Sequence, residues 1–256
     1  MISDKIYEQM KNLVIEVGNI MLEVDYDKLD INEKQGNHNI VTKYDILIQE
    51  KLKKELLNLV PNASFIGEEG DNFDLNKEYK FIVDPIDGTM NFSRKLNLSA
   101  VSVALLQNNE PIVGICYVPY SHELYEARKG FGAYLNGKKI HVSDKKLKDG
   151  IVFCGSSPYY DDLREKSVEI LTKFCSIASD YRRLGSAVIE ICSVASGKAE
   201  VYVELKIMPW DHAAASLILK EAGGIVTTID GNKINYNEPT SIIASNSIED
   251  YLKYLN

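Results

Sequence analysis

The sequence predicts a layered α/β fold, and three observations support this prediction. Two helical segments open the chain, a block of closely spaced strands follows, and strands then alternate with helices to the end. Alternation after a β-rich block is typical of helices packed in layers against sheets. The chain has 256 residues, of which 45% are hydrophobic, and this suits one large domain or two fused lobes.

The first half is predicted to begin with two helices. Apolar residues at helical spacing predict a helix over Ser3–Val24. A polar link over Asp25–Asn39 separates it from a second helix at about Tyr44–Leu59, which Pro61 ends. The dipeptide Asn136-Gly137 predicts a hairpin turn. Between the second helix and this turn, strands are expected at Phe81–Val83, Ser99–Leu106, Ile112–Val118 and Leu124–Ala127.

The second half is predicted to be a separate lobe. A polar stretch at Ser143–Gly150 is rich in Lys and Asp, and it is interpreted as the boundary between residues 1–145 and 146–256. The expected strands are Ile151–Cys154, Tyr181–Leu184, Glu200–Leu205, Ile225–Ile229 and Ser241–Ser245. The expected helices are Asp161–Ile177, one beginning near Ser186, one from Pro209 to Gly223-Gly224, and one at the carboxyl terminus.

Charge and composition exclude several classes of partner. The net charge of −8 and the pI of about 5.2 disfavour nucleic acid and anionic membranes, which need a basic face. No apolar stretch is long enough to span a bilayer, and the first residues do not form a signal peptide. The four cysteines form no Cys-x-x-Cys pair. We therefore predict a reduced, cytoplasmic protein with no nucleic-acid or membrane partner.

One run, Lys80–Thr89, combines an apolar strand with two acids and a turn. The strand is predicted to stop at Asp84, because Pro85 cannot donate to a sheet. Asp84 and Asp87 flank the turn and can hold a hard divalent cation, which prefers oxygen ligands. The adjacent backbone N–H groups and the Thr89 hydroxyl can hold a phosphate. The alternative is an Asp-Pro turn with a capping aspartate.

Two other apolar runs also end in acids. Glu68 and Glu69 follow one short run, and Asp211 lies beside the only tryptophan in the first turn of a predicted helix. Each has an ordinary explanation, because loop acids are solvated and an acid at a helix N-terminus answers the helix dipole. Three such segments together favour a metal site.

These segments resemble the three signatures of the inositol monophosphatase family, in the family's order. The matching residues are Gly67-Glu68-Glu69, Asp84 to Phe92, and Trp210 to Ala215 continuing to Gly223-Gly224. The resemblance covers essentially the whole chain. It implies the five-layer αβαβα sandwich of the sugar phosphatases and a Mg²⁺-dependent, lithium-sensitive hydrolysis of a small phosphate monoester by metal-activated water.

Inositol 1-phosphate is the first choice of substrate that the resemblance implies. Superfamily relatives that act on fructose 1,6-bisphosphate, 3′-phosphoadenosine 5′-phosphate or NADP leave phosphorylated polyols and nucleotides open as alternatives. A regulatory binding protein that kept the fold and a purely structural cation site are alternatives of other classes. We also expect a homodimer.

The resemblance implies roles for individual residues around the metal. Glu68, Asp84 and the Ile86 carbonyl would bind one Mg²⁺, and Glu68 would help a third. Asp84, Asp87 and Asp211 would bind the second. Thr89 with Asp45 behind it matches the catalytic pair that orients and deprotonates the water, and the N–H groups of Gly88 and Thr89 would hold phosphate oxygens. Asp45 could instead be an ordinary helix-start acid.

Selectivity is expected to come from the second lobe. Gly185, Ser186, Ala187 and Glu204 match positions that face the substrate, with Asp211 beside them, although Gly185 could simply start a helix and Glu204 could simply end a strand. Ser156 and Ser157 are weaker candidates.

Several charged residues depart from the pattern or stand beside it. Lys206, with Arg182 and Arg183, suggests an extra cation near the pocket, which puts strict inositol phosphate specificity in doubt. Lys34 lies where the family often places a basic loop residue. His212 is interpreted as a helix-surface residue and not as a metal ligand.

Overall fold

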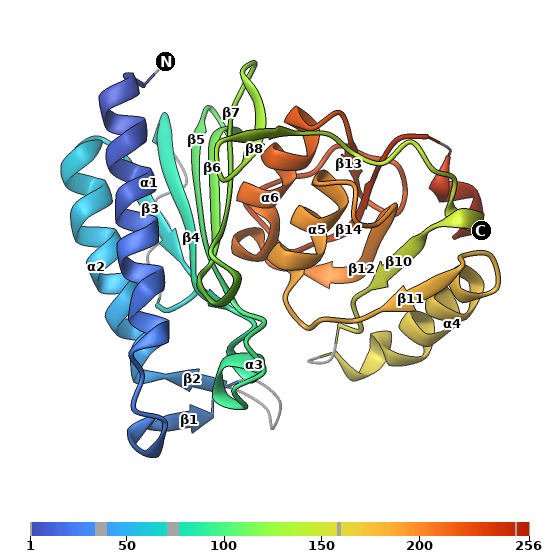
Figure 1. The fold of residues 1–256 in the computed structure, drawn as a ribbon, viewed down its shortest axis with the longest axis horizontal. Helices are drawn as coiled ribbons and strands as arrows, with labels where there is room; N and C mark the ends of the chain where they lie inside the picture. Colours follow the sequence, from blue (N-terminus) through green and yellow to red (C-terminus); the bar gives the residue numbers. More distant parts are fainter. Residues whose placement is uncertain (1, 34–39, 71–76, 158–159, 249, 256) are drawn as a thin grey trace.

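The computed structural model describes residues 2–33, 40–70, 77–157, 160–248 and 250–255. Two large sheets alternate with helices in layers (Figure 1). From left to right the layers are helices α1 and α2, a seven-stranded sheet, helices α5 and α6, a five-stranded sheet, and helix α4. The predicted five-layer αβαβα sandwich is therefore confirmed.

The predicted helices are found with differences at their ends, and the short helix at Thr89–Ser93 was not predicted. Ser3 caps the first helix and accepts from the Ile6 N–H at 3.3 Å, but the last predicted turn is a separate 3₁₀ segment, Ile20–Leu22. The predicted terminal helix is also a 3₁₀ segment, Tyr251–Tyr254. The α-helices are α1 (Asp4–Asn19), α2 (Lys43–Leu59), α3 (Thr89–Ser93), α4 (Arg164–Cys175), α5 (Ala187–Ala195) and α6 (Pro209–Glu221).

The seven-stranded sheet has its strands in chain order. Only its first pair, β3 with β4, is parallel, and the others are antiparallel. The Asn136-Gly137 turn joins the last two strands as predicted, and both residues have positive φ angles. The strands are β3 (Ser64–Gly67), β4 (Tyr79–Asp87), β5 (Ala100–Gln107), β6 (Glu110–Val118), β7 (Glu123–Arg128), β8 (Gly132–Leu135) and β9 (Lys138–Ile140).

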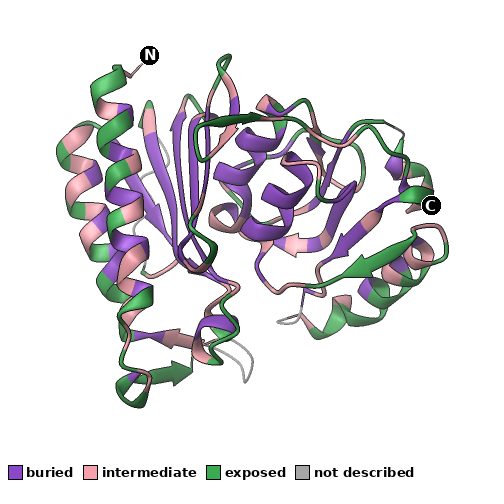
Figure 2. Ribbon diagram, in the orientation of Figure 1, coloured by how far each residue is buried: buried purple, intermediate pink, exposed green. Residues whose placement is uncertain are grey.

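Both faces of this sheet are buried. Successive residues of a strand point to opposite faces, so each strand contributes to two cores. In β4, Phe81 and Val83 pack with α1 and α2, whereas Ile82 packs with α5 and α6. The strands and the two central helices are accordingly almost wholly buried (Figure 2). The apolar runs that predicted strands are continuous because neither face meets water.

The five-stranded sheet has the order β11-β10-β12-β14-β13. Helices α5 and α6 cover one face and α4 covers the other. Its strands are β10 (Ile151–Cys154), β11 (Asp180–Arg182), β12 (Val201–Ile207), β13 (Ile225–Thr227) and β14 (Thr240–Ser245). The two sheets fall on either side of the division between residues 145 and 146, which we retain as the proposed lobe boundary.

Two predictions about local structure were wrong. Part of the expected polar link forms strand β1 (Ile31–Glu33), which pairs with β2 (Ile40–Thr42). Strand β4 does not stop at Asp84 but continues to Asp87. Pro85 interrupts the ladder without ending the strand, because two residues of β4 there oppose one residue of β5.

This bulge has a direct consequence for the acids. Residues three apart on a regular strand face opposite sides of the sheet. One extra residue between Asp84 and Asp87 turns both carboxylates to the same side.

Within the described residues, no helix is both long enough and apolar enough to cross a bilayer.

Candidate active site

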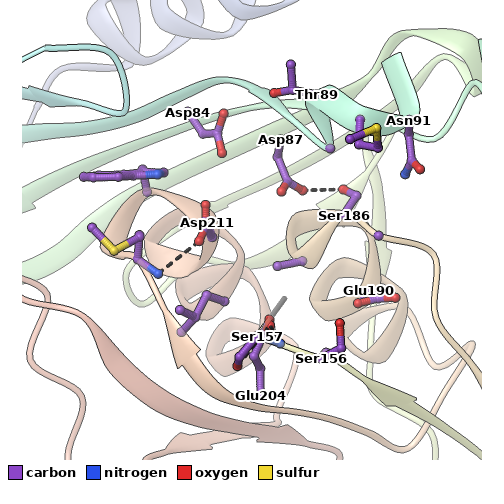
Figure 3. Close-up of a pocket in the computed structure, with 18 of the residues that line it drawn as sticks. Asp84, Asp87, Thr89, Asn91, Ser156, Ser157, Ser186, Glu190, Glu204 and Asp211 are labelled. Atoms are coloured by element: carbon purple, nitrogen blue, oxygen red, sulfur yellow. Dashed lines mark hydrogen bonds between the residues drawn. The ribbon is translucent and has the colours of Figure 1, made fainter. Parts of the chain in front are cut away.

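A pocket of about 930 Å³ lies where the two sheets meet the short helix α3. One wall comes from the end of β3, the bulged end of β4 and the start of α3. The other comes from residues 155–157, the start of α5, strand β12 and the start of α6. Figure 3 shows acidic side chains on both walls.

Three carboxylates converge at one end of this pocket. Each of Asp84, Asp87 and Asp211 offers an oxygen within 4.8 Å of the others. Asp84 and Asp87 come from the bulged strand, whereas Asp211 comes from the first turn of α6, more than a hundred residues later. Glu68 lines the same pocket, so all four predicted metal-binding acids are brought together.

Hydrogen bonds fix the direction of each carboxylate. The Ile86 N–H donates to Asp84 at 3.0 Å, and the Met208 N–H donates to Asp211 at 3.0 Å. Asp87 accepts from the Ser186 hydroxyl and from the Val188 N–H at 2.9 Å. All three carboxylates line the pocket in these fixed orientations.

The electrostatics of this cluster call for a cation. Burial, and then the charge of Glu68, raise the pKa of Asp84 well above its usual value. Burial, followed by the charges of Asp87 and Glu68, does the same for the pKa of Asp211. Burial raises the pKa of Asp87 to about 7. A hard divalent cation would neutralise these like charges with the oxygen ligands it prefers, so the residues fit a metal ion.

Thr89 and Asp45 form the predicted pair beside the acids. The Thr89 hydroxyl lies 3.1 Å from a carboxylate oxygen of Asp45 and 3.0 Å from the carbonyl oxygen of Ile86. Asp45 is fully buried, and burial raises its pKa. Its other oxygen accepts from the N–H and hydroxyl of Thr42, at 2.8 and 2.6 Å. Asp45 is therefore both the helix-start acid and the partner of Thr89.

Gly88 permits a close approach that no other residue would allow. Its φ is +84°, and an added Cβ would lie 2.9 Å from the Leu98 carbonyl oxygen and 3.2 Å from that of Gly185. The backbone of Gly88 and Thr89 thereby lines the pocket next to the acids.

The second wall, which also carries Asp211, holds the predicted selectivity residues. Gly185, Ser186, Ala187 and Glu204 line the pocket. Glu204 accepts from the Tyr202 hydroxyl and from the Ser157 N–H at 2.8 Å, and burial raises its pKa. The Ser186 hydroxyl donates to Asp87, so this side chain supports an acid. Ser156 also lines the pocket.

The predicted extra cation is present, although Arg182 is not part of it. Arg183 and Lys206 line the pocket, and the Lys206 ammonium lies 3.8 Å from the centre of the Tyr160 ring. Arg182 points elsewhere and pairs with Asp180 at 2.6 Å. Lys34 lies outside the described residues.

The interpretation of His212 as a helix-surface residue was wrong. His212 is fully buried, and its ring lies 5.5 Å from that of Tyr236. Helix α6 runs between the two sheets and has almost no exposed face, which a sequence cannot show. Burial lowers the pKa of His212 to about 3, so it is a neutral core residue and does not line the pocket.

Sequence reasoning missed Glu190 and Asn91, which also line the pocket. Glu190 is only 2% exposed, and burial raises its pKa to about 8. An acid within the apolar helix Ala187–Ala195 is a signal that could have found it. Asn91 was noticed only as part of the second signature.

This fold, with acids suited to a metal beside a polar pocket, defines the class of metal-dependent phosphoric monoester hydrolases. The chain belongs to the inositol monophosphatase family, whose model matches residues 3–255. The family assignment made from the three signatures is thereby confirmed.

Individual relatives carry several names. A fructose-1,6-bisphosphatase/inositol-1-monophosphatase of Aquifex aeolicus is 34% identical over 88% of this chain and 86% of its own. The Nus factor SuhB of Vibrio cholerae is 34% identical over 86% of this chain and 82% of its own. The staphylococcal SaIMPase-II, solved with 2′AMP, has a TM-score of 0.82 and 27% identity over 96% of this chain and 90% of its own. The same protein was solved with inositol monophosphate.

Proposed function

We propose that this protein is a Mg²⁺-dependent phosphatase of small phosphate monoesters, with inositol 1-phosphate as its preferred substrate. The observation that carries the proposal is the convergence of three aspartates, two of them buried and one half-buried, beside the Thr89–Asp45 pair. The names and ligands of the relatives support a phosphorylated polyol or nucleotide as the substrate.

The chain offers two sets of oxygen ligands. Glu68, Asp84 and the Ile86 carbonyl would hold one ion, and Asp84, Asp87 and Asp211 would hold the second. Glu68 could also contribute to a third. Mg²⁺, when bound, supplies positive charge to the phosphate oxygens and lowers the pKa of the attacking water.

The protein's own groups would position that water and take its proton. Thr89 lines the pocket, and its hydroxyl lies within hydrogen-bond distance of Asp45. The Thr89 oxygen can then accept the water's proton while its own proton moves to Asp45. Burial raises the pKa of Asp45, which makes it a better acceptor. The N–H groups of Gly88 and Thr89 would hold the phosphate.

The first experiment is a phosphatase assay against inositol 1-phosphate, fructose 1,6-bisphosphate, 3′-phosphoadenosine 5′-phosphate and NADP. We expect turnover with Mg²⁺, none in chelator, and inhibition by millimolar lithium. Full turnover in chelator would contradict the proposal. Light scattering in the same buffer tests the proposed homodimer, and fractionation of cells tests the proposed cytoplasmic location.

Glu204 gives a test of the selectivity wall. We expect Glu204→Gln to raise KM for inositol 1-phosphate more than KM for a small aryl phosphate, because Glu204 lies across the pocket from Asp84 and Asp87. Steady-state kinetics on both substrates measure the difference. Equal effects would mean that Glu204 does not contact the ring.

A second candidate substrate class is a sugar with two phosphates. Arg183 and Lys206 line the pocket, and the ion pairs found within the described ranges involve neither. They offer positive charge to a second anionic group, as on fructose 1,6-bisphosphate, and the charge of Arg183 also acts on the pKa values of Glu190 and Glu204.

Arg183→Gln tests this second class. A charged hydrogen bond is worth about 1.5–3 kcal/mol, so we expect kcat/KM for fructose 1,6-bisphosphate to fall roughly 10- to 100-fold. Fructose 1-phosphate, which lacks the second phosphate, should change little. Arg182→Gln is the matched control, because Arg182 is the neighbouring residue and pairs with Asp180 outside the pocket. Equal losses on both sugars would exclude a second phosphate subsite at Arg183.

The alternative to a phosphatase is a regulatory binding protein that kept the fold. One relative is named Nus factor SuhB, and this name is the reason to retain the alternative. The net charge of −8 disfavours direct binding of RNA. Absence of turnover on every substrate above would favour this alternative.

A further inference from the structure

Two buried side chains hold the backbone of Leu184 on both sides. The Leu184 N–H donates to the Glu190 carboxylate. The Leu184 carbonyl accepts from the Asn91 side-chain amide at 2.7 Å. Glu190 comes from α5, whereas Asn91 comes from α3, at the opposite wall of the pocket. Asn91 is 7% exposed and Glu190 is 2% exposed, so both side chains that make these part-buried bonds are themselves shielded from water.

The contact between the two walls leaves no room for adjustment. Asn91 also donates to the Leu98 carbonyl at 2.8 Å, which fixes its amide plane. Gly185 has φ +77°, and an added Cβ would lie 3.3 Å from the Asn91 amide nitrogen. A Cβ added to Gly88 would likewise lie 3.2 Å from the Gly185 carbonyl oxygen. The turn at residues 184–186 therefore packs directly against the segment that carries Asp87.

The turn at residues 184–186 leads directly to the two groups that bond to Asp87. The Ser186 hydroxyl donates to one oxygen of Asp87 (Figure 3). The Val188 N–H donates to the same oxygen at 2.9 Å. The position of both donors depends on where the chain leaves Leu184. A shift of this turn would therefore move the donors that aim the other Asp87 oxygen at the pocket.

We propose that Asn91 and Glu190 are positioning residues: by holding Leu184 from both walls of the pocket, they place Ser186 and Val188 on Asp87 and so set the geometry of the acid cluster. This inference rests on the proposed function, because it concerns an acid assigned there to metal binding. Neither residue is among the proposed metal ligands. Groups that orient metal ligands typically change metal affinity about 10- to 100-fold when replaced.

A direct role for Glu190 in substrate binding makes a different prediction. Its carboxylate lines the pocket and could accept from a substrate hydroxyl. A positioning role needs only an acceptor for the Leu184 N–H, which glutamine retains. A role that depends on the negative charge is lost in glutamine.

The test compares Asn91→Leu, Glu190→Leu and Glu190→Gln with wild type. Each protein is melted in chelator and over a Mg²⁺ titration, and the Mg²⁺ dependence of the melting temperature gives the apparent affinity. Ser93→Ala is the matched control on α3, because its hydroxyl bonds only within that helix and is exposed. kcat and KM for inositol 1-phosphate are measured at low and at saturating Mg²⁺.

We expect both leucine variants to bind Mg²⁺ roughly 10- to 100-fold more weakly, with kcat recovering in part at saturating Mg²⁺. Glu190→Gln and Ser93→Ala should bind it as wild type does. The two leucine changes together should cost less than the sum of each, because both act through Leu184. If either leucine variant does not fold, Asn91→Ala and Glu190→Ala, which admit water to the freed groups, should show the same order with smaller losses.

Wild-type Mg²⁺ affinity in both leucine variants, or in both alanine variants, overturns the inference while leaving the proposed function intact. Glu190→Gln as damaging as Glu190→Leu also overturns it, in favour of a direct charge role. A wild type that Mg²⁺ does not stabilise overturns the proposed function and this inference together.

Discussion

Replacing Thr89 with alanine is expected to lower kcat by roughly 10²–10⁴, the usual contribution of a positioned proton acceptor. Among the described residues, the Thr89 hydroxyl is the pocket-lining group that bonds to Asp45, since Asp45 itself is fully buried and does not line the pocket. Without that hydroxyl, Asp45 has no route to the attacking water. Steady-state kinetics at saturating Mg²⁺ measure the loss.

Thr89→Ser is the matched control, because it keeps the hydroxyl and removes only a methyl group. We expect it to retain most of the activity. Both variants should bind Mg²⁺ nearly as wild type does in a melting titration, because the three converging aspartates are unchanged. Normal turnover by Thr89→Ala would reduce Thr89 to a residue of the turn that starts α3.

The parts of this site that could be predicted are those encoded over a few neighbouring residues. Strand β10 falls at Ile151–Cys154 as expected, because its apolar run is short and bounded by polar stretches. The acids of all three signatures were found because each follows an apolar element. The family resemblance then assembled Asp84 and Asp211 into one cluster, which no local pattern could do.

The parts that could not be predicted depend on contacts between distant segments. Pro85 gave a correct local reason to end a strand, but pairing with β5 carries the strand past it through a bulge. His212 looked exposed because the position of α6 between two sheets is a property of the whole fold. Glu190 and Asn91 act on Leu184 from different elements, so their partnership is invisible along the chain.

Asp211 offers the second large effect, and it involves stability as well as activity. Burial and the charges of Asp87 and Glu68 raise the pKa of Asp211, so its ionised form destabilises the metal-free protein. We expect Asp211→Asn to stabilise that form by ~0.5–2 kcal/mol, the usual gain from relieving such a conflict at a functional site. The asparagine oxygen can still accept from the Met208 N–H, so the start of α6 keeps its cap.

The pH dependence of this gain follows from the direction of the pKa shift. A carboxyl whose pKa is raised by folding favours the folded state while it is protonated, and this contribution is lost as the pH rises through the folded-state value. The advantage of Asp211→Asn should therefore be small near the ordinary aspartate pKa of 3.8 and grow toward neutral pH. Melting curves in chelator across this range measure it.

The same substitution should remove function while it adds stability. We expect Asp211→Asn to lower kcat by at least ~10², because the second Mg²⁺ loses a charged ligand. It should also shrink the rise in melting temperature that Mg²⁺ provides, since that rise follows the affinity for the ion. Paired melting curves with Mg²⁺ and with chelator test both effects in one series. A variant that is less stable in chelator, yet gains as much from Mg²⁺ as wild type, would show that Asp211 only starts helix α6 and does not bind the metal.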